Sequence, residues 1–335
     1  MFNLKWGDVL PENQGSHSIK KALQVARRDG FPVMFSKILA RLRYAAIGGA
    51  PRNALKRFVV PRIKEWMRRQ DPSLPAVEQE LLPPGTPLAA IIITCYNYGK
   101  YLAEAVDSAL GQTLGNIEVI IVDDGSEDPY TREVLREIES GGRVRVIRQP
   151  NRGLPAARNA GIQETQARYI CCLDADDLID PTYLEKAAMV LEARPDYGLA
   201  YPLAQLFGDV AETWQTEPLD PAKLLQYNHI PVVAVFRRLA WEKSGGYDEK
   251  MRLGYEDWEF WLRLAGEGYR GHLIPEPLFK HRRHGKTMTH SAQEKHQQLS
   301  EEIRKKHARV AQVKQLPPQE VKPEQAFINL HSKKT

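Results

Sequence analysis

The sequence predicts an α/β fold in which a mainly parallel sheet is flanked by helices. From residue 88 onward, short apolar runs alternate with helical segments, a pattern typical of parallel strands joined by helical crossovers. Two of these runs end abruptly in carboxylates, where open α/β sheets bind ligands. A chain of 335 residues with 42% hydrophobic content can form one sizeable domain and an appendage.

The expected elements follow in chain order. The first-half strands are 88–94, 117–122, 144–148 and 169–173, and the helices between them are 99–112, 129–140 and 154–167. The second half is less regular, with strands near 198–202 and 232–236, a helix over 257–266 and a strand before Lys280. Residues 291–315 read as a charged helix with little apolar face, and a polar tail follows it.

Four regions are therefore expected: a basic helical extension over 1–70, a Pro-rich linker over 71–87, the α/β domain over 88–285, and a C-terminal helix and tail over 286–335. Residues 1–87 hold 15 Lys and Arg against seven Asp and Glu, whereas the remainder holds 32 against 35. Such a basic arm suits an anionic membrane surface, and a helical hairpin packed on the domain explains it equally well. Nucleic acid is not an expected partner, because stacking aromatics are sparse and no binding motif is present.

Nothing in the sequence indicates export or a membrane span. No apolar run approaches the ~18 residues that a spanning helix needs, and the first residues do not resemble a secretory signal. Cys95, Cys171 and Cys172 lie in or beside predicted strands and lack metal-ligand spacing, so we expect small buried hydrophobes in a reducing compartment. The expected location is cytoplasmic, with peripheral attachment to the inner face of the cell membrane.

The most informative segment is Tyr169–Asp177, an apolar run that ends in Asp174, Asp176 and Asp177. Adjacent carboxylates repel and cannot all be buried unpaired. A hard divalent cation, Mg²⁺ or Mn²⁺, relieves that repulsion with one or two carboxylates and leaves positions for substrate phosphates. A solvated turn with Asp180 as helix N-cap is the alternative, and it accounts for Asp180 alone.

Two further strand ends and the helix after them carry polar groups. Tyr96 follows the first strand and could stack on a flat base or simply pack. Asp123 and Asp124 follow the second strand, where a carboxylate could accept from a base or ribose, or close a turn in which Gly125 supplies the unusual dihedral. Arg158 lies on the next helix and could hold phosphate, hold the metal-site carboxylates, or merely be exposed.

In this order, these motifs resemble the family 2 glycosyltransferases of the GT-A fold over about residues 87–285. The matching motifs are T-C-Y-N-Y, E-V-I-I-V-D-D-G-S, N-R-G-L-P-A-A-R-N-A-G and Y-I-C-C-L-D-A-D-D. The resemblance implies that the nucleotide is held by Thr94, Tyr96, Asp124, Arg158 and Asp174. It also implies a D-x-D metal site in which Asp176 is the surer ligand and Asp174 faces ribose or metal.

Glu256 and Asp257 begin a helix, and the resemblance implies that Asp257 is the general base while Glu256 binds the neighbouring framework. A preference for carboxylates at helix N-termini explains the pair equally well in isolation. The aromatic residues of this helix are expected to pack in the core, although Trp258 could touch an acceptor. Farther on, His281 or His284 could complete the metal sphere, with His284 favoured.

The expected function is metal-dependent, inverting transfer of a sugar from a nucleotide-sugar donor to a hydroxyl of a glycan or lipid-linked glycan. The resemblance implies a UDP-type donor, which is the usual choice of the family. The setting would be bacterial-type surface polysaccharide and cell-envelope synthesis, with Mn²⁺ or Mg²⁺ as cofactor. The alternatives are a non-catalytic nucleotide-sugar or glycan-binding protein on the same fold, and a nucleotidyltransferase. A dinucleotide oxidoreductase is disfavoured because no G-x-G-x-x-G follows any strand.

Overall fold

The structure is a computed structural model that describes residues 85–194, 196–285 and 294–310. All of them belong to one compact unit, which spans residues 79–317. The basic extension over 1–70, its expected membrane contact, most of the Pro-rich linker and the polar tail lie outside the described residues. Among the helices within those ranges, none has the length and apolar character required to cross a membrane.

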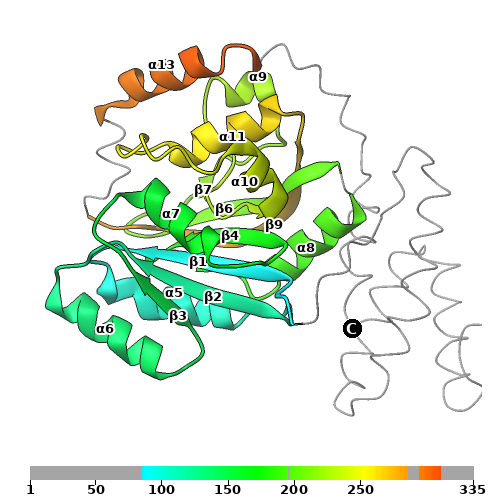
Figure 1. Ribbon diagram of the computed structural model, residues 1–335. Coiled ribbons are helices and arrows are strands. Elements are labelled where there is room, and N and C mark those ends of the chain that lie inside the picture. Colours follow the sequence, from blue (N-terminus) through cyan, green and yellow to red (C-terminus); the bar gives the residue numbers. More distant parts are fainter. Residues whose placement is uncertain (1–84, 195, 286–293, 311–335) are drawn as a thin grey trace, which may run out of the picture. The chain divides into compact units, whose positions relative to one another are not determined.

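The strands form one mixed sheet in the order β3-β2-β1-β4-β8-β6-β9-β5, with β7 paired to β6 (Figure 1). They are β1 Ala89–Cys95, β2 Ile117–Asp123, β3 Arg145–Arg148, β4 Tyr169–Asp174, β5 Leu178–Ile179, β6 Tyr197–Gly208, β7 Thr213–Trp214, β8 Val235–Arg237 and β9 Arg270–Arg283. The first four strands are parallel, as predicted. Beyond β4 the sheet becomes mixed, because β8 pairs antiparallel with both β4 and β6.

The helices lie on both faces of this sheet. They are α5 Gly99–Leu110, α6 Pro129–Ser140, α7 Leu154–Gln163, α8 Tyr183–Ala193, α9 Pro221–Leu224, α10 Arg238–Ser244, α11 Glu256–Gly266 and α13 His296–Lys306. Helices α7, α10 and α11 lie on the face opposite α5 and α6 (Figure 1). Two-sided cover explains why the central strands are nearly continuous apolar runs: Ile91, Ile92 and Ile93 are all fully buried.

One glycine sets the distance between α7 and the sheet. A Cβ at Gly161 would lie 2.4 Å from Ile92 Cγ2 and 2.9 Å from Val122 Cγ2. The absence of a side chain therefore lets the helix rest directly on β1 and β2. Because α7 also carries Arg158, this close packing fixes the height of that side chain above the strand ends.

The strand register brings the motif residues to one edge. In the parallel ladders, Thr94 is level with Asp174 across β1 and β4, and Cys95 is level with Asp123 across β1 and β2. Because parallel strands end on the same side, the polar residues that follow them converge there. All three cysteines are buried free thiols, as predicted.

Two local predictions differ from the structure. Asp180 is not the N-cap of α8: the helix begins at Tyr183, and the Asp180 carboxylate accepts from the Thr182 N–H and hydroxyl in a short turn. The C-terminal helix also has an apolar side, because Leu299 and Ile303 are 3% and 0% exposed. Two apolar residues one turn apart are enough to pack a short helix against the domain, although most of its other residues are polar or charged.

Candidate active site

Asp174, at the end of β4, lies beside Thr94, and their side chains are in contact. Thr94 Oγ1 is 3.4 Å from Asp174 Oδ1, and the two residues lie level with each other near the ends of neighbouring strands. Asp174 remains partly open, with 28% of its side chain exposed. Tyr96, two residues beyond Thr94, is 42% exposed, so its ring is available to a ligand. This edge thus combines an accessible carboxylate with an accessible aromatic ring.

Arg158 is the buried centre of the site. Its guanidinium lies over the Tyr247 ring at 5.5 Å, and one arm is 2.9 Å from Asp174 Oδ1. The other arm contacts Glu256 Oε1 at the start of α11. The side chain is 1% exposed, so it holds carboxylates rather than reaching a free phosphate. Arg158 therefore contacts one carboxylate of the candidate metal site, Asp174, together with Glu256.

Glu256 and Asp257 follow Tyr255, whose φ of 63° turns the chain sharply into α11. Burial raises the pKa of Glu256 to about 7, while Arg158 opposes that rise. Burial also raises the pKa of Asp257 above its usual value, again opposed by Arg158. A carboxylate with a raised pKa suits proton acceptance near neutral pH.

Asp257 is held in place by two donors. Its Oδ1 accepts from the Trp258 N–H at 2.8 Å, and its Oδ2 accepts from Asn228 Nδ2 at 3.0 Å. Asn228 is itself oriented, because its Oδ1 accepts from the Ile230 N–H at 3.1 Å. No sequence motif gives Asn228 a role. Only the tertiary fold brings it to Asp257.

The aromatic residues of α11 pack in the core. Trp258, Phe260 and Trp261 are at most 1% exposed, and Trp258 Nε1 donates to the Leu224 carbonyl at 2.5 Å. The expectation that these residues anchor the helix is therefore confirmed. An acceptor contact by Trp258 is wrong for this conformation, because the ring is enclosed between α11 and α9.

Asp124 organises the loop that enters α7. Its carboxylate accepts from Gln149 Nε2 at 2.7 Å, the Arg152 N–H at 2.9 Å and the Gly153 N–H at 2.8 Å. A carboxylate offers about four acceptor positions, so one remains for a ligand. The turn itself is closed by Asp123, which accepts from the Ser126 N–H at 2.9 Å, and Gly125 supplies φ +78°.

Asp176 meets the histidine that the sequence favoured. His284 Nε2 lies 2.9 Å from Asp176 Oδ2, and the imidazole packs against the rings of Tyr101 at 4.5 Å and Tyr98 at 5.7 Å. Burial next to Asp174 raises the pKa of Asp176. The two tyrosines come from the start of α5 and its preceding turn, and motif reasoning gave them no part in placing His284.

His281 has a different partner, the fully buried Asp177. Its Nδ1 is 3.0 Å from Asp177 Oδ2, and the Arg282 N–H donates to Asp177 Oδ1 at 2.8 Å. Burial raises the pKa of Asp177 to about 6, while His281 opposes the rise. Arg282 Nε also donates to the Asp176 carbonyl at 2.8 Å. These bonds attach the end of β9 to the acidic turn and thereby hold His284 next to Asp176.

The donor set fits a divalent cation that the substrate helps to hold. Within the residues the structure describes, no group of three His, Cys, Asp or Glu side chains could bind a metal by itself. Asp174 and Asp176 nevertheless present hard oxygen atoms at the open strand ends, and His284 adds a nitrogen. Mg²⁺ and Mn²⁺ commonly bind one or two carboxylates and take their other ligands from phosphates and water.

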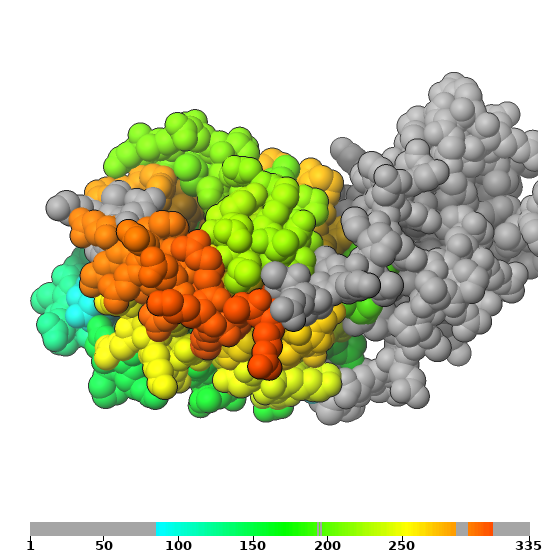
Figure 2. Space-filling model, turned by 90° about the horizontal axis from the view of Figure 1, so that it is seen from above, coloured from blue at the N-terminus to red at the C-terminus, as the bar shows by residue number. Residues whose placement is uncertain are grey.

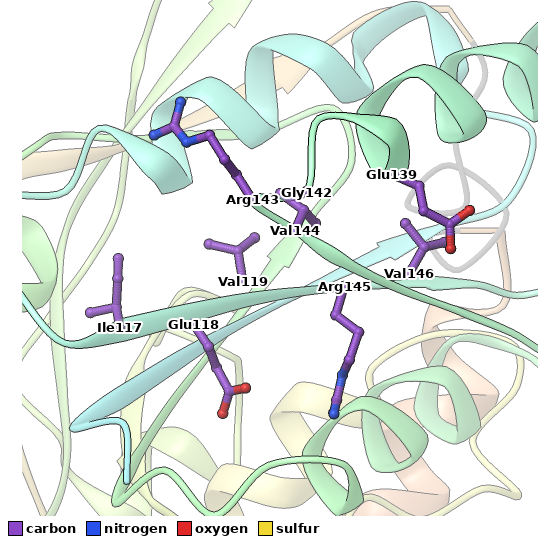
Figure 3. A pocket seen from close by; sticks show the side chains of 9 residues that line it. All are labelled: Ile117, Glu118, Val119, Glu139, Gly142, Arg143, Val144, Arg145 and Val146. Atoms are coloured by element: carbon purple, nitrogen blue, oxygen red, sulfur yellow. The ribbon is translucent and has the colours of Figure 1, made fainter. Parts of the chain in front are cut away.

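A hollow lies away from this site. It has a volume of about 420 Å³ and includes the first residues of β2, Ile117 and Glu118 (Figure 3). Arg145 begins β3 in the same wall. Parallel strands that start here end at the acidic cluster, so the hollow lies at the opposite end of the sheet. We assign it no part in the chemistry.

The fold and site together define a GT-A-type transferase domain: a mixed α/β sheet with an acidic cluster at the carboxyl ends of its parallel strands. Residues 90–247 match the family model described as glycosyl transferase family 2. Residues 90–247 therefore form a family 2 glycosyltransferase domain, as the motifs predicted. This family generally uses a divalent metal ion.

Named relatives agree with this assignment. Chondroitin synthase of Escherichia coli is 31% identical over 193 residues, which are 56% of this chain and 28% of the relative. Hyaluronan synthase of Pasteurella multocida is 30% identical over 192 residues, 56% of this chain and 20% of the relative. This chain thus spans well under half the length of these curated relatives.

Solved structures share the fold. The crystal structure of S. aureus TarS 1-349 in complex with UDP-GlcNAc has 18% sequence identity and a TM-score of 0.52, and the match covers 60% of each chain. At this identity the likeness concerns the fold alone.

Proposed function

We propose that this protein is a metal-dependent, inverting glycosyltransferase that moves a sugar from a nucleotide-sugar donor to a hydroxyl of a glycan or lipid-linked glycan. The observation that carries the proposal is the bridge made by Arg158. It joins Asp174, at the strand end expected to meet the donor, to Glu256, which directly precedes the candidate base. One rigid cluster therefore serves both reacting partners.

The donor is proposed to lie along the strand ends. Tyr96 would stack on the base, Thr94 and Asp174 would face the ribose, and the remaining acceptor position of Asp124 would take an imide or hydroxyl proton. Arg158 would act on the diphosphate only indirectly, by fixing Asp174. A UDP-type donor is favoured because a TarS structure of the same fold holds UDP-GlcNAc.

Asp174, Asp176 and His284 would hold the divalent ion together with the donor diphosphate. When bound, such an ion offsets the negative charge that develops on the leaving diphosphate. The protein contributes to its binding by keeping Asp176 and His284 in contact, with the imidazole fixed between Tyr98 and Tyr101.

Asp257 is proposed to accept the acceptor proton. The hydroxyl oxygen attacks the anomeric carbon, the bond from that carbon to the diphosphate oxygen breaks, and its electron pair leaves with the nucleoside diphosphate. The hydroxyl proton passes to Asp257, which later releases it to water. A single displacement of this kind inverts the anomeric configuration. Asn228 and the Trp258 N–H keep the carboxylate oriented.

The acceptor class and the biological setting are inferred from the names of the relatives. Chondroitin and hyaluronan synthases are named for polysaccharide products, so we infer a role in synthesising a surface polysaccharide. A cytoplasmic location with peripheral membrane attachment through residues 1–70 belongs to the same proposal. It would bring the site near a lipid-linked acceptor.

The test is a panel of nucleotide sugars incubated with the purified full chain and Mn²⁺ or Mg²⁺, scored for release of free nucleoside diphosphate. Asp176→Ala is expected to abolish turnover of the accepted donor. Asp257→Asn is expected to retain donor binding and lose transfer. The matched controls are Asp107→Ala on the exposed side of α5 and Glu267→Gln beyond the last residue of α11, both expected to behave as wild type.

Failure of every donor to bind or turn over, with both metals, would overturn the proposal in favour of a non-catalytic protein. Conversion of the nucleotide sugar and added pyrophosphate to a nucleoside triphosphate and a sugar 1-phosphate would instead indicate a nucleotidyltransferase. If Asp257→Asn transferred sugar at the wild-type rate, the assignment of the base would be wrong while the transferase activity stood.

A further inference from the structure

The helix that carries the candidate base contains a second, unexplained carboxylate. Glu259 is fully buried one turn after Glu256 and points away from the Arg158 cluster to different partners. Its Oε2 is 2.6 Å from Arg263 Nη2 on the same helix. Its Oε1 is 2.9 Å from His307 Nε2 and 2.6 Å from Lys306 Nζ. An uncompensated buried charge is costly, so these partners are required wherever Glu259 is ionised.

Two of these partners come from the C-terminal segment. Lys306 is the last residue of α13, and His307 directly follows it. Lys306 also contacts Asp248 at 2.7 Å, in the loop before α11. The C-terminal segment thereby ties α11 to the chain that leads into it.

Further contacts extend along the whole of α11. Before its first residue, Tyr255 Oη is 3.0 Å from His296 Nδ1. At its last residue, a Cβ on Gly266 would lie 3.1 Å from Val310 Cγ2. The space-filling view shows α13 and the residues after it, in orange to red, spread across this face of the molecule (Figure 2).

We propose that segment 296–310 positions the base helix, with Lys306 and His307 acting through Glu259 to fix the placement of Asp257. This inference rests on the proposed function of Asp257. Asp257 and Glu259 are two residues apart on one rigid helix, so a shift of Glu259 moves the base. Misplacing a catalytic group by about 1 Å can cost on the order of a hundredfold in rate. Both α11 and the segment lie beyond residue 247, where the family match ends.

The experiment compares the full chain with a Lys306→Met/His307→Gln variant and with Lys305→Met, an exposed neighbour on the same helix. We expect the double variant to lower kcat for sugar transfer by about tenfold to a hundredfold while the affinity for UDP with Mn²⁺ stays within about twofold. Amide hydrogen exchange in the first turn of α11 should accelerate. Lys305→Met should match wild type in all three measurements, and the single variant Lys306→Arg, which keeps a cation beside Glu259, should retain much of the wild-type kcat.

Unchanged kcat together with unchanged exchange in α11 would overturn the proposal. A loss of UDP affinity equal to the loss of kcat, in parallel with faster exchange throughout the sheet, would show general destabilisation and overturn it as well. If the wild-type chain transferred no sugar, the proposed function would fail separately. Exchange in α11 would still reveal whether the segment fixes the helix.

Discussion

Arg158 Nη2 lies 2.9 Å from Asp174 Oδ1, although the two residues belong to different layers of the fold. The guanidinium rises from α7, the carboxylate ends β4, and a second carboxylate, Glu256, reaches the same guanidinium from α11. The guanidinium offsets part of the negative charge of two carboxylates that would otherwise repel each other. It also makes the relative positions of the strand end and α11 depend on one side chain.

Replacing Arg158 by Met should therefore be severely destabilising. The change keeps the apolar stem but leaves Glu256 and Asp174 without their cation, and breaking a buried pair typically costs about 3–5 kcal/mol. Denaturant unfolding of the full chain measures the loss. Arg152→Met is the control, because its pair with Glu249 is exposed and such pairs contribute up to about 1 kcal/mol. Equal losses in the two variants would contradict the bridging role.

Asn228→Ala should change the pH dependence of transfer. Burial raises the pKa of Asp257, and the Asn228 N–H opposes this by stabilising the ionised carboxylate. Losing that donor should raise the pKa further, so the acidic limb of the kcat profile should move to higher pH. A hydrogen bond to a charged group is worth about 1.5–3 kcal/mol, so a shift of about one to two pH units is expected.

The pH profile of Asn228→Ala is compared with that of Gln226→Ala, an exposed residue of the same loop. An acidic limb at the wild-type pH in Asn228→Ala would show that Asn228 does not act on the base.

Much of this arrangement could be predicted because parallel strands obey a register. Once 88–94 and 169–173 are recognised as neighbouring strands, Thr94 and Asp174 must emerge at the same edge, and the structure places them level in the ladder. A contact between Arg158 and the carboxylates of the predicted metal site was one of the interpretations that the sequence allowed. Local pattern and sheet geometry were sufficient for these features.

The remaining features depend on packing that no local pattern encodes. Asn228 reaches Asp257 from an irregular loop. His284 rather than His281 contacts Asp176, because Asp177 and Arg282 fix the end of β9. The docking of α13 depends on a few buried side chains in a mostly charged segment. Such choices follow from tertiary contacts between segments far apart in the chain.

Acid unfolding should reveal the contribution of Glu259. Burial alone would raise its pKa, but donors from His307, Arg263 and Lys306 lower it to about 2, against an ordinary 4.5. A carboxyl group with a lowered folded pKa stabilises the protein above its unfolded pKa. That contribution, on the order of 3 kcal/mol, should be lost as the pH falls from about 4.5 to about 2.

The measurement is the difference in unfolding free energy between wild type and Glu259→Gln from pH 7 to the lowest pH at which both fold. The difference should shrink below pH 4.5, because the wild-type residue becomes neutral like its replacement. A difference independent of pH would show that the ionised carboxylate contributes nothing.

Gly161→Ala should separate α7 from the sheet. The added Cβ would lie 2.4 Å from Ile92 Cγ2 and 2.9 Å from Val122 Cγ2, and overpacking of this kind typically costs about 1–3 kcal/mol. Because α7 carries Arg158, UDP binding should weaken as well. Gly115→Ala is the control, since nothing lies within 4 Å of its Cβ position. Stability is measured by thermal unfolding. Equal melting temperatures for Gly161→Ala and Gly115→Ala would contradict the close-packing argument.

Metal binding should distinguish the two histidines. His284 Nε2 touches the candidate ligand Asp176, whereas His281 is engaged with the buried Asp177. His284→Ala should raise the Mn²⁺ concentration needed for half-maximal binding in the presence of UDP by about tenfold or more, and His281→Ala should raise it much less. Free Mn²⁺ measured by electron paramagnetic resonance reports binding without relying on turnover. Equal effects would refute the preference for His284, and no effect from either would place the ion on the carboxylates and diphosphate alone.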